Sequence, residues 1–276
     1  MPDTRPQTSF SDVADVVSVR TSGELPIIVG GHAVNIWALT YASRLGARLN
    51  PYAPFTSKDL DLWGPKEILD SLAQKYGVKI TLSPPRSPGI GYVMIPKGDL
   101  QLKVELLINV NGLRQAELEN TFDLVIQGTE VRVLDAISCL KAKIANAADI
   151  DQTNRQDVKH VEIMKICAHE FTKDLIVLGD QKRGSERLVV NRLEDLRETI
   201  GSLKAAAVTT KWNLTFDEVL PVDAIRSSTM EKVQILSGFG WNNKNPAVPR
   251  CLSEATVHFR KLTQIRLQTM PSPHPV

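Results

Sequence analysis

The sequence predicts an α/β (α+β) fold in which a mixed β-sheet is flanked by helices and followed by a mostly helical C-terminal region. Residues 25–134 alternate short apolar strands with helix-spaced segments, whereas the residues after 135 show mainly three- and four-residue apolar steps. The 276-residue chain is 42% hydrophobic and 23% charged, which is ordinary for a globular protein with a full core. We therefore expect a first domain over 1–134 and a mostly helical second domain over 135–276.

Composition restricts the kinds of partner and compartment. The formal net charge of +2 at pH 7 and the isoelectric point near 8.4 neither require nor exclude a nucleic-acid partner. Cys139, Cys167 and Cys251 are far apart and lack C-x-x-C spacing, so we expect reduced, structural thiols. The sequence shows no signal-peptide core, no apolar run of about 18 residues and no H-E-x-x-H cluster. We therefore expect a cytoplasmic protein without a membrane segment or a zinc site.

The first predicted strand runs directly into a pair of glycines, Gly30 and Gly31. LPIIVGG (25–31) reads as a short buried strand, and the apolar spacing after it predicts a helix that stops at Gly46. Backbone N–H groups at the start of a helix favour phosphate, and glycine lets a ligand approach the backbone closely. The segment therefore fits a phosphate-binding turn, and it also fits a plain connection between strand and helix.

The second predicted strand carries two acids one residue apart. In the stretch DLDL, Asp59 and Asp61 point to one side of an extended strand, and Leu60 and Leu62 point to the other. Two carboxylates this close repel each other and raise each other's pKa unless a cation lies between them. A hard divalent metal is the natural candidate. The alternative is a pair of structural acids that cap a turn or pair with Lys58.

The remaining segments predict further strands and helices, and a third acid on a strand. They are a helix over 66–77 that stops at Gly77, strands over 78–82, 91–95 and 100–110, a hairpin over 122–134 turned at Gly128, a helix over 135–147 with Asp135 as N-cap, helices over 154–171 and 185–208, and a short helix over 252–266 before a Pro-rich tail. Within 100–110, Leu102, Val104 and Leu106 share one face, and Glu105 lies on the other. A carboxylate on a strand is unexpected without a partner, so Glu105 joins the candidate acids.

Taken in order, these motifs resemble the nucleotidyltransferase superfamily, whose fold is polymerase-beta-like. The motifs are the glycine pair at 30–31, S-K-D-L-D-L at 57–62, K-V-E at 103–105, A-K-I at 142–144 and R-Q-D at 155–157. The resemblance spans about residues 24–171 and is closest to the branch that includes the abortive-infection type toxins of bacterial toxin–antitoxin systems. His32 stands where that superfamily usually has a phosphate-contacting serine, and Ser57 stands where threonine is usual.

The resemblance implies a site made from both halves of the chain. It implies metal ligation by Asp59, Asp61 and Glu105, catalytic roles for these acids with Lys143 and Asp157, and nucleotide binding by Gly30, Gly31, His32, Ser57 and Lys143. The expected cofactor is Mg²⁺ or Mn²⁺. Other interpretations of the helical residues stay open: Lys143 and Lys141 could be solvated surface lysines, and Arg155 and Asp157 could form a local ion pair.

The resemblance further implies an NTP-dependent enzyme, with ATP among the possible donors. Residues 1–134 would form the catalytic domain, transferring a nucleotide to an acceptor hydroxyl of tRNA or protein with release of pyrophosphate. A toxin role with an antitoxin protein as partner belongs to this interpretation. Two alternatives remain: a catalytically silent protein that binds nucleotide or a partner and regulates it, and a transferase acting on a small hydroxylated molecule such as an antibiotic.

Overall fold

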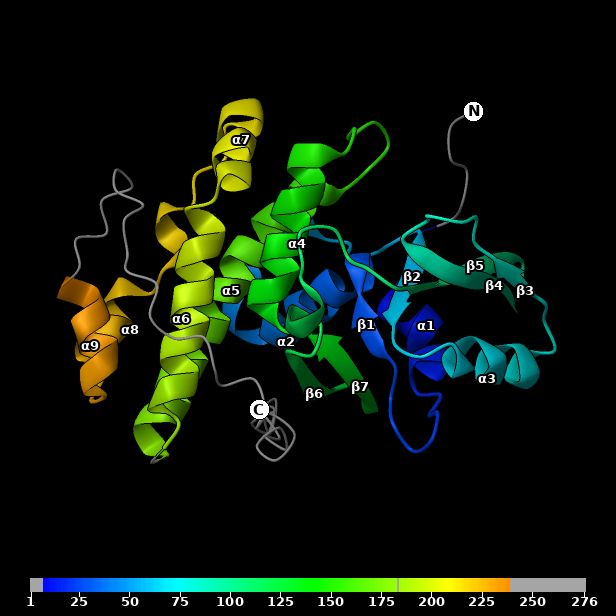
Figure 1. The fold of residues 1–276 in the computed structure, drawn as a ribbon, viewed down its shortest axis with the longest axis horizontal. Helices are drawn as coiled ribbons and strands as arrows, with labels where there is room; N and C mark the ends of the chain where they lie inside the picture. The colour runs from blue at the N-terminus through cyan, green and yellow to red at the C-terminus, as the bar shows by residue number, and fades with distance from the viewer. Residues whose placement is uncertain (1–6, 183, 239–276) are drawn as a thin grey trace, which may run out of the picture.

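A computed structural model describes residues 7–182 and 184–238, and the chain is organised around a seven-stranded mixed sheet (Figure 1). Its strands are β1 (Ile27–Val29), β2 (Asp59–Trp63), β3 (Ile80–Leu82), β4 (Gly89–Lys97), β5 (Leu100–Leu107), β6 (Thr121–Ile126) and β7 (Thr129–Leu134). The strand order is β3-β4-β5-β2-β1-β7-β6, with β2 parallel to β5, β1 parallel to β7 and the other neighbours antiparallel. The α/β class predicted from the sequence is confirmed.

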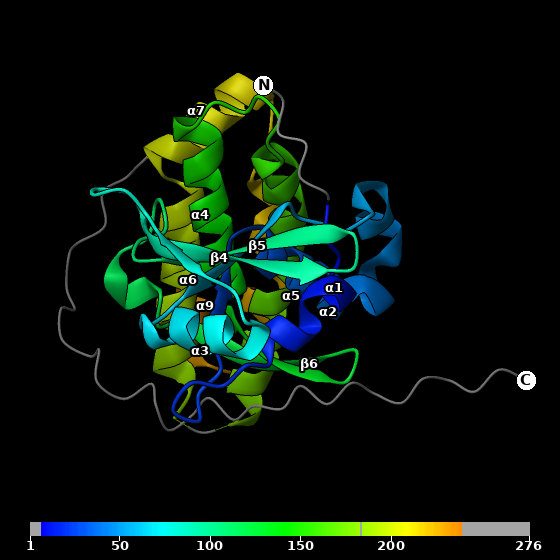
Figure 2. The same ribbon diagram turned by 90° about the vertical axis from the view of Figure 1, so that its right-hand side faces the viewer.

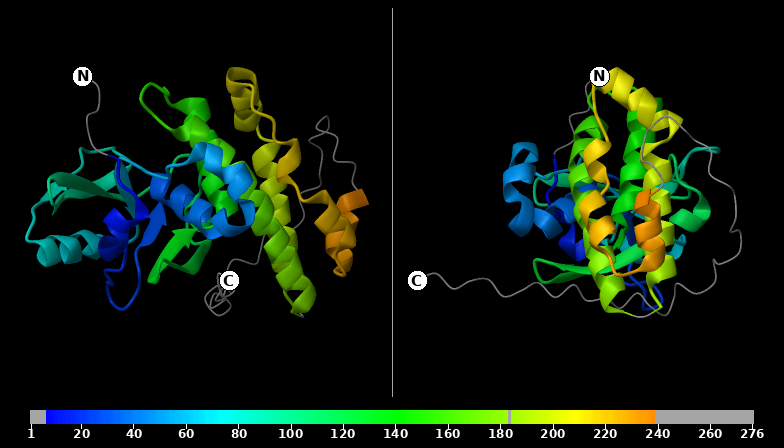
Figure 3. Two further views of the ribbon diagram at one scale, coloured as in Figure 1. Left: turned by 180° about the vertical axis from the view of Figure 1, so that it is seen from behind. Right: turned by 90° about the vertical axis from the view of Figure 1, so that its left-hand side faces the viewer.

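Helices flank this sheet and make up most of the rest of the described chain. They are α1 (Phe10–Val17), α2 (Gly30–Leu49), α3 (Glu67–Tyr76), α4 (Ala136–Asp149), α5 (Asp157–Gln181), α6 (Glu186–Ile200), α7 (Leu203–Trp212), α8 (Val222–Ser227) and α9 (Glu231–Gly238), with short 3-10 turns η1 (Asn50–Tyr52), η2 (Gln115–Glu117) and η3 (Asp217–Val219). α2 contacts β1, β2, β6 and β7, α3 contacts β3 and β4, and α1 packs against α2. Seen from behind, α2 lies against α4 and α5 (Figure 3).

Alternation along β2 and its neighbours gives the sheet one buried face and one partly exposed face. Leu60 and Leu62 are fully buried, whereas Asp59, Asp61 and Trp63 are only partly buried. β5 follows the same pattern, so its acid and its lysine share the partly exposed face with the two aspartates. The period-2 prediction for both strands is confirmed.

Several helix boundaries differ from those that the sequence predicts. The helix predicted over 154–171 runs over Asp157–Gln181, and the one predicted over 185–208 is divided into α6 and α7. The helix predicted to stop at Gly46 continues to Leu49, with a break in helical geometry at Leu45. The fully buried Leu49 side chain supplies the reason, because one more turn brings it into the core. The sequence patterns predicted no helix before residue 25, whereas α1 forms there and buries the apolar side chains of Phe10 and Val13.

Other local predictions are confirmed by backbone geometry. Gly77 ends α3 with a φ of 62°, and Gly128 turns the β6–β7 hairpin with a φ of 80°. Cys139 and Cys167 are buried free thiols. Cys251 and the helix predicted over 252–266 lie outside the described residues.

One hydrophobic core joins the sheet to the helices that follow it. It contains Ile28 and Leu60 from the strands together with Ile144 and Phe171 from α4 and α5. A smaller apolar cluster joins α5 and α6 to the helices at the end of the described chain. Because the main core contains residues from both sides of position 134/135, it does not mark a domain boundary there, and the boundary predicted from the sequence stays a prediction. Within the described range, no helix combines the length and the apolar character needed to cross a membrane.

The start of α4 is fixed by a buried carboxylate. Asp135 accepts hydrogen bonds from the backbone N–H groups of Ile137 and Ser138, as its N-cap position predicts. It also forms an ion pair with the Arg192 guanidinium of α6 at 3.0 Å, and both side chains are almost fully buried. This carboxylate therefore holds α4 against α6.

We expect Asp135→Ala to lower the free energy of unfolding by about 3–5 kcal/mol, because it leaves the Arg192 charge buried and removes a helix cap. The matched control is Ser202→Ala, which removes only the side-chain cap of α7 and should cost about 1 kcal/mol. Urea unfolding followed by circular dichroism measures both values. Equal losses for the two variants would contradict the role given to the Asp135–Arg192 pair.

Candidate active site

The glycine turn predicted from the sequence packs directly against the second strand. Gly30 has a φ of 65°, and a Cβ atom placed there would lie 2.0 Å from Oδ2 of Asp61. A Cβ atom on Gly31 would lie 2.3 Å from Oγ of Ser57. Only glycine at both positions allows this approach. The turn thereby brings Asp61 and Ser57 to the start of α2, where the first backbone N–H groups lack helical partners.

Strand register places the candidate acids side by side on the partly exposed face. Asp61 pairs with Glu105 of β5 on one side and with Val29 of β1 on the other, and Asp59 pairs with Lys103. Burial raises the pKa of Asp61 to about 7; the Lys143 ammonium opposes this rise, and the carboxylates of Asp59 and Glu105 add to it. The three acids named from the sequence are therefore electrostatically coupled.

The third acid, however, is engaged by a neighbouring cation. Lys103 Nζ lies 2.6 Å from Glu105 Oε2, and its ammonium also lies 5.0 Å from the centroid of the Tyr92 ring. Within residues 7–182 and 184–238, no three His, Cys, Asp or Glu side chains gather closely enough to form a metal group. The donor chemistry still suits a hard cation, because carboxylate oxygens are its preferred ligands and the partly buried Asp61 carboxylate has two like charges beside it.

Lys143 of α4 lies in the interior and faces the acids. Its Nζ is 3.0 Å from Oδ1 of Asp157, and the two side chains are 7% and 3% exposed. Arg155 and Asn146 also donate to Asp157. Burial raises the pKa of the Asp157 carboxyl, but the charges and hydrogen bonds of Lys143 and Arg155 outweigh it and hold that pKa well below its usual range. The local pair between Arg155 and Asp157 is therefore present, and it extends to Lys143.

His32, which the resemblance places in the site, and Lys141, a neighbour of Lys143 on α4, occupy positions that limit their roles. The His32 side chain is fully buried, and its Nε2 lies 3.1 Å from Oγ1 of Thr8. Burial lowers the pKa of His32 to about 4, so the ring is neutral at physiological pH. Lys141 points to Glu117, with Nζ 2.7 Å from Oε1. His32 can therefore reach a ligand only through its backbone, and Lys141 is already paired.

His160 is a neighbour of the site that the sequence did not indicate. Its ring is buried, and its Cε1 atom would lie 3.3 Å from a Cβ atom placed on Gly31. Neither ring nitrogen has a hydrogen-bond partner among the described residues. Burial and the nearby Lys143 charge hold its pKa well below the ordinary value. Only its position at the fourth residue of α5, after Asp157, could have suggested it, because that spacing puts both on one helix face.

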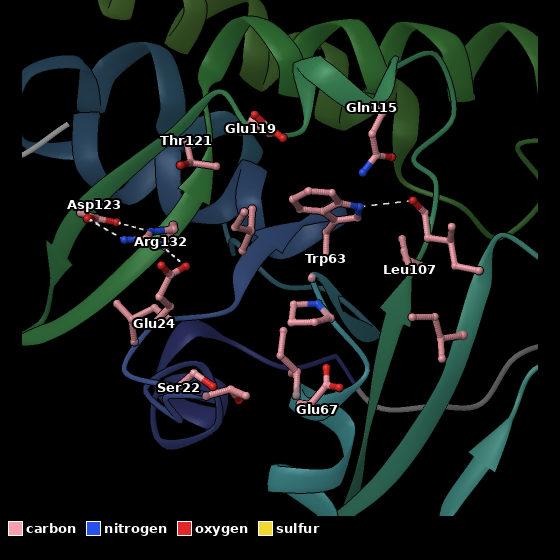
Figure 4. Close-up of a pocket in the computed structure, with 18 residues that line it drawn as sticks. Ser22, Glu24, Trp63, Glu67, Leu107, Gln115, Glu119, Thr121, Asp123 and Arg132 are labelled. Atoms are coloured by element: carbon pink, nitrogen blue, oxygen red, sulfur yellow. Dashed lines mark hydrogen bonds and ion pairs between the residues drawn. The ribbon is translucent and has the colours of Figure 1, made fainter. Parts of the chain in front are cut away.

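A cavity of about 910 Å³ opens on the same face of the sheet. Figure 4 shows the Trp63 ring in its wall, with Gln115 above it and Glu67 below, and the Asp123–Arg132 pair on one side. The indole N–H of Trp63 donates to the carbonyl of Ile108 at 3.2 Å, which fixes the ring. Because Trp63 follows Asp61 by two residues on β2, the cavity begins next to the row of Asp61 and Glu105 on the same face.

Comparisons with known proteins give limited information. No protein-family model matches the chain, and no curated protein matches it. Among solved structures, the chain is similar to the crystal structure of an antigenic nucleotidyltransferase-like protein from Paracoccidioides brasiliensis, with 13% sequence identity and a TM-score of 0.37. The similarity covers 67% of this chain and 94% of that chain. A similarity with this identity and this TM-score does not assign the chain to a family.

We expect Lys143→Met to lower the free energy of unfolding by about 3 kcal/mol, because it removes the most buried partner of the Asp157 carboxylate. The matched control is Lys204→Met, which breaks an exposed pair with Asp149 and should cost at most about 1 kcal/mol. Chemical denaturation at pH 7 gives both numbers. A loss for Lys143→Met no larger than that of the control would show that the buried pair does not stabilise the site.

A second prediction concerns acid sensitivity. Between about pH 6.5 and 4 the unfolded chain takes up a proton at residue 32 that the folded chain excludes, so His32 lowers the stability as pH falls through this window, whereas Asp61, whose pKa is raised, acts in the opposite direction. His160 and His169, whose pKa values are also lowered, act in the same direction as His32. His32→Gln, which keeps a hydrogen-bonding side chain toward Thr8, should reduce this slope. Urea midpoints measured at pH 7 and 4.5 test this, and identical slopes for both proteins would refute it.

Proposed function

We propose that the protein is a metal-dependent nucleotidyltransferase that moves a nucleotide from an NTP to an acceptor hydroxyl. The observation that supports this most is the packing of the Asp61 carboxylate against the Gly30 turn, in register with Glu105 on the next strand. This places carboxylates beside the unpaired backbone donors of a helix start. A triphosphate and a divalent cation are ligands that require these two kinds of group together.

Each group would have a separate task in this reaction. Backbone N–H groups of Gly30, Gly31 and His32 would bind phosphate oxygens, and the Ser57 hydroxyl beside the turn would add a donor. Lys143, held in place by the Asp157 carboxylate, would neutralise phosphate charge. Asp157 would thereby act as a positioning residue.

The carboxylates would hold the metal. Asp59 and Asp61 would ligate Mg²⁺ or Mn²⁺, and Glu105 would join them once it leaves Lys103. When bound, the cation would supply Lewis-acid stabilisation of phosphate charge. Lys103, released from Glu105, would lie on the same face as the acids and could contact an incoming phosphate.

The acceptor and the biological role are further proposals. We propose tRNA or protein as acceptor, with a toxin role and an antitoxin partner as the biological setting, and a small hydroxylated molecule as the alternative. A second function has a specific observation in its favour: the ion pair between Lys103 and Glu105 engages the third acid, as in a protein that binds nucleotide without transferring it. Incubation with each labelled NTP, Mg²⁺ and either total tRNA, cell lysate or small acceptors tests transfer directly.

We expect Asp59→Asn and Asp61→Asn each to abolish labelled transfer while the fold persists. Loss of one metal contact should cost several kcal/mol of transition-state stabilisation, and each ~1.4 kcal/mol is a factor of ten in rate. Stability should hold or rise in Asp61→Asn, because burial and like charges make the ionised carboxylate costly. The matched control is Asp99→Asn in the exposed β4–β5 turn, which should retain full transfer.

Thermal melting and transfer, each measured with and without Mg²⁺, separate the candidate functions. Metal-dependent NTP binding without transfer in the unmodified protein would favour the non-catalytic function. Near-normal transfer by both aspartate variants would refute the metal site. Reduced stability with activity proportional to the folded fraction would indicate purely structural acids.

A further inference from the structure

His160 is a buried polar residue to which the proposed reaction gives no task. The residue is 5% exposed, and both of its ring nitrogens lack a hydrogen-bond partner within residues 7–182 and 184–238. Burial of hydrogen-bonding atoms without partners is costly, so an apolar ring would suit a purely structural position better. The two nitrogens therefore indicate a partner that binds from outside the chain.

The edge of the ring that carries both nitrogens faces the glycine turn. Cε1, the carbon between the two nitrogens, is the His160 atom nearest to the Cβ position of Gly31. The Ser57 hydroxyl lies 2.3 Å from the same position. The imidazole, the hydroxyl and the first backbone N–H groups of α2 thus surround one point.

The charges around the ring favour an anion at this point. Lys143 and Lys159 are cations that act on the ring, whereas Asp157 is a carboxylate that also pairs with Arg155. His160 lies in the first turn of α5, so the N-terminal ends of α2 and α5 meet here. Both helix dipoles present their positive ends to the same region.

The ring is suited to donating a hydrogen bond in its neutral form. Burial, assisted by the Lys143 and Lys159 charges, holds the pKa of His160 well below its ordinary value although Asp157 opposes this. A neutral imidazole carries one N–H donor and one acceptor nitrogen. An N–H donor beside a hydroxyl and backbone N–H groups suits a phosphate oxygen, which accepts several hydrogen bonds.

The two glycines divide the turn between the acids and the ring. The Cβ position of Gly30 faces Asp61, and that of Gly31 faces His160. The Lys143 charge acts on both Asp61 and His160. A phosphate chain whose reacting phosphorus lies at the acids would therefore extend past Lys143 and place its remaining phosphates at Gly31.

We propose that His160 binds the pyrophosphate portion of an NTP by donating its ring N–H to a phosphate oxygen, so that the site prefers triphosphates to monophosphates. The inference rests on the proposed function for the identity of the ligand, whereas binding of pyrophosphate itself does not require nucleotide transfer. His160 orients the group that leaves and exchanges no proton with it.

Calorimetric titrations with pyrophosphate, AMP and α,β-methylene-ATP, each with Mg²⁺, test the proposal. The methylene bridge prevents cleavage of the nucleotide during the measurement. His160→Phe, an apolar ring of similar size, should weaken binding of pyrophosphate and of α,β-methylene-ATP at least about tenfold, equivalent to ~1.4 kcal/mol. Its affinity for AMP should change less than about twofold, and His160→Gln, which keeps an N–H donor, should recover part of the loss.

The matched control is His169→Phe on the same helix. Nδ1 of His169 is also buried without a partner among the described residues, but it lies about 13 Å further along α5. This variant should bind pyrophosphate like the unmodified protein. The melting temperature of His160→Phe should hold or rise, because an apolar ring suits the buried position. The ring N–H signal that His160→Phe removes from the ¹⁵N NMR spectrum should shift when pyrophosphate is added.

Four results would overturn the proposal: no binding of pyrophosphate by the unmodified protein, unchanged affinity in His160→Phe, an equal loss in His169→Phe, or an equal loss for AMP. A lower melting temperature of His160→Phe with unchanged affinity would give the ring a structural role instead. A shift of the ring signal with a divalent metal alone would make it a metal ligand.

A transfer assay on the same variants separates this inference from the proposed function. Transfer at the normal rate by His160→Phe, with unchanged pyrophosphate affinity, would refute the role of His160 and leave the proposed function standing. Pyrophosphate binding that depends on His160, in a protein that transfers no nucleotide to any acceptor, would do the reverse.

Discussion

The close approach of the Gly30 turn to β2 is the constraint on which the site depends. Because no Cβ atom fits between Gly30 and the Asp61 carboxylate, the first strand can enter α2 while the antiparallel second strand keeps its acid beside the helix start. The same approach fixes the position of Ser57 against Gly31. A side chain at either glycine would separate the backbone donors from the carboxylates and leave two unrelated features.

Electrostatic balance inside the molecule limits where the other site residues can lie. The Lys143 ammonium is buried and pairs with Asp157, and its charge also opposes the rise in the pKa of Asp61 that burial causes. A buried cation needs a carboxylate partner, and Asp157 supplies one from the start of α5. Since α4 is fixed in turn by the Asp135–Arg192 pair, the charge facing the acids is set by helices outside the sheet. The helical region and the sheet are thus joined by charge as well as by the common core.

Local patterns in the sequence predicted much of the fold and part of the site. The alternation in β2, the caps at Gly77 and Asp135, and the hairpin at Gly128 depend on neighbouring residues alone, so they could be predicted. The continuation of α2 past Gly46 could not, because tertiary burial of Leu49 overrides a weak local signal.

The parts of the site that escaped prediction depend on register and on distant segments. Lys103 and Glu105 are two residues apart, and strand alternation puts residues at that spacing on one face, but their ion pair depends on side-chain direction. The burial of the His32 side chain depends on contact with Thr8 from a separate segment. The cavity is lined by residues from Thr21 to Arg132, so no single stretch of sequence could reveal it.

Carboxylates lie at both ends of the partly exposed face of the sheet, although the chain as a whole has a net charge of +2. At one end, the backbone N–H groups at the start of α2 and the Lys143 charge lie close to Asp61. In the view of Figure 2, β4 and β5 lie in front of α4. At the other end, the carboxylates around Trp63 exceed the single guanidinium. The two ends therefore differ in the groups that balance their carboxylates: Lys143 and the backbone donors of the Gly30 turn at one end, and Arg132 at the other. The proposed transfer would use the first end, because backbone donors and a cation for phosphate lie beside carboxylates only where the Gly30 turn, Lys143 and Asp61 meet in the described part of the chain.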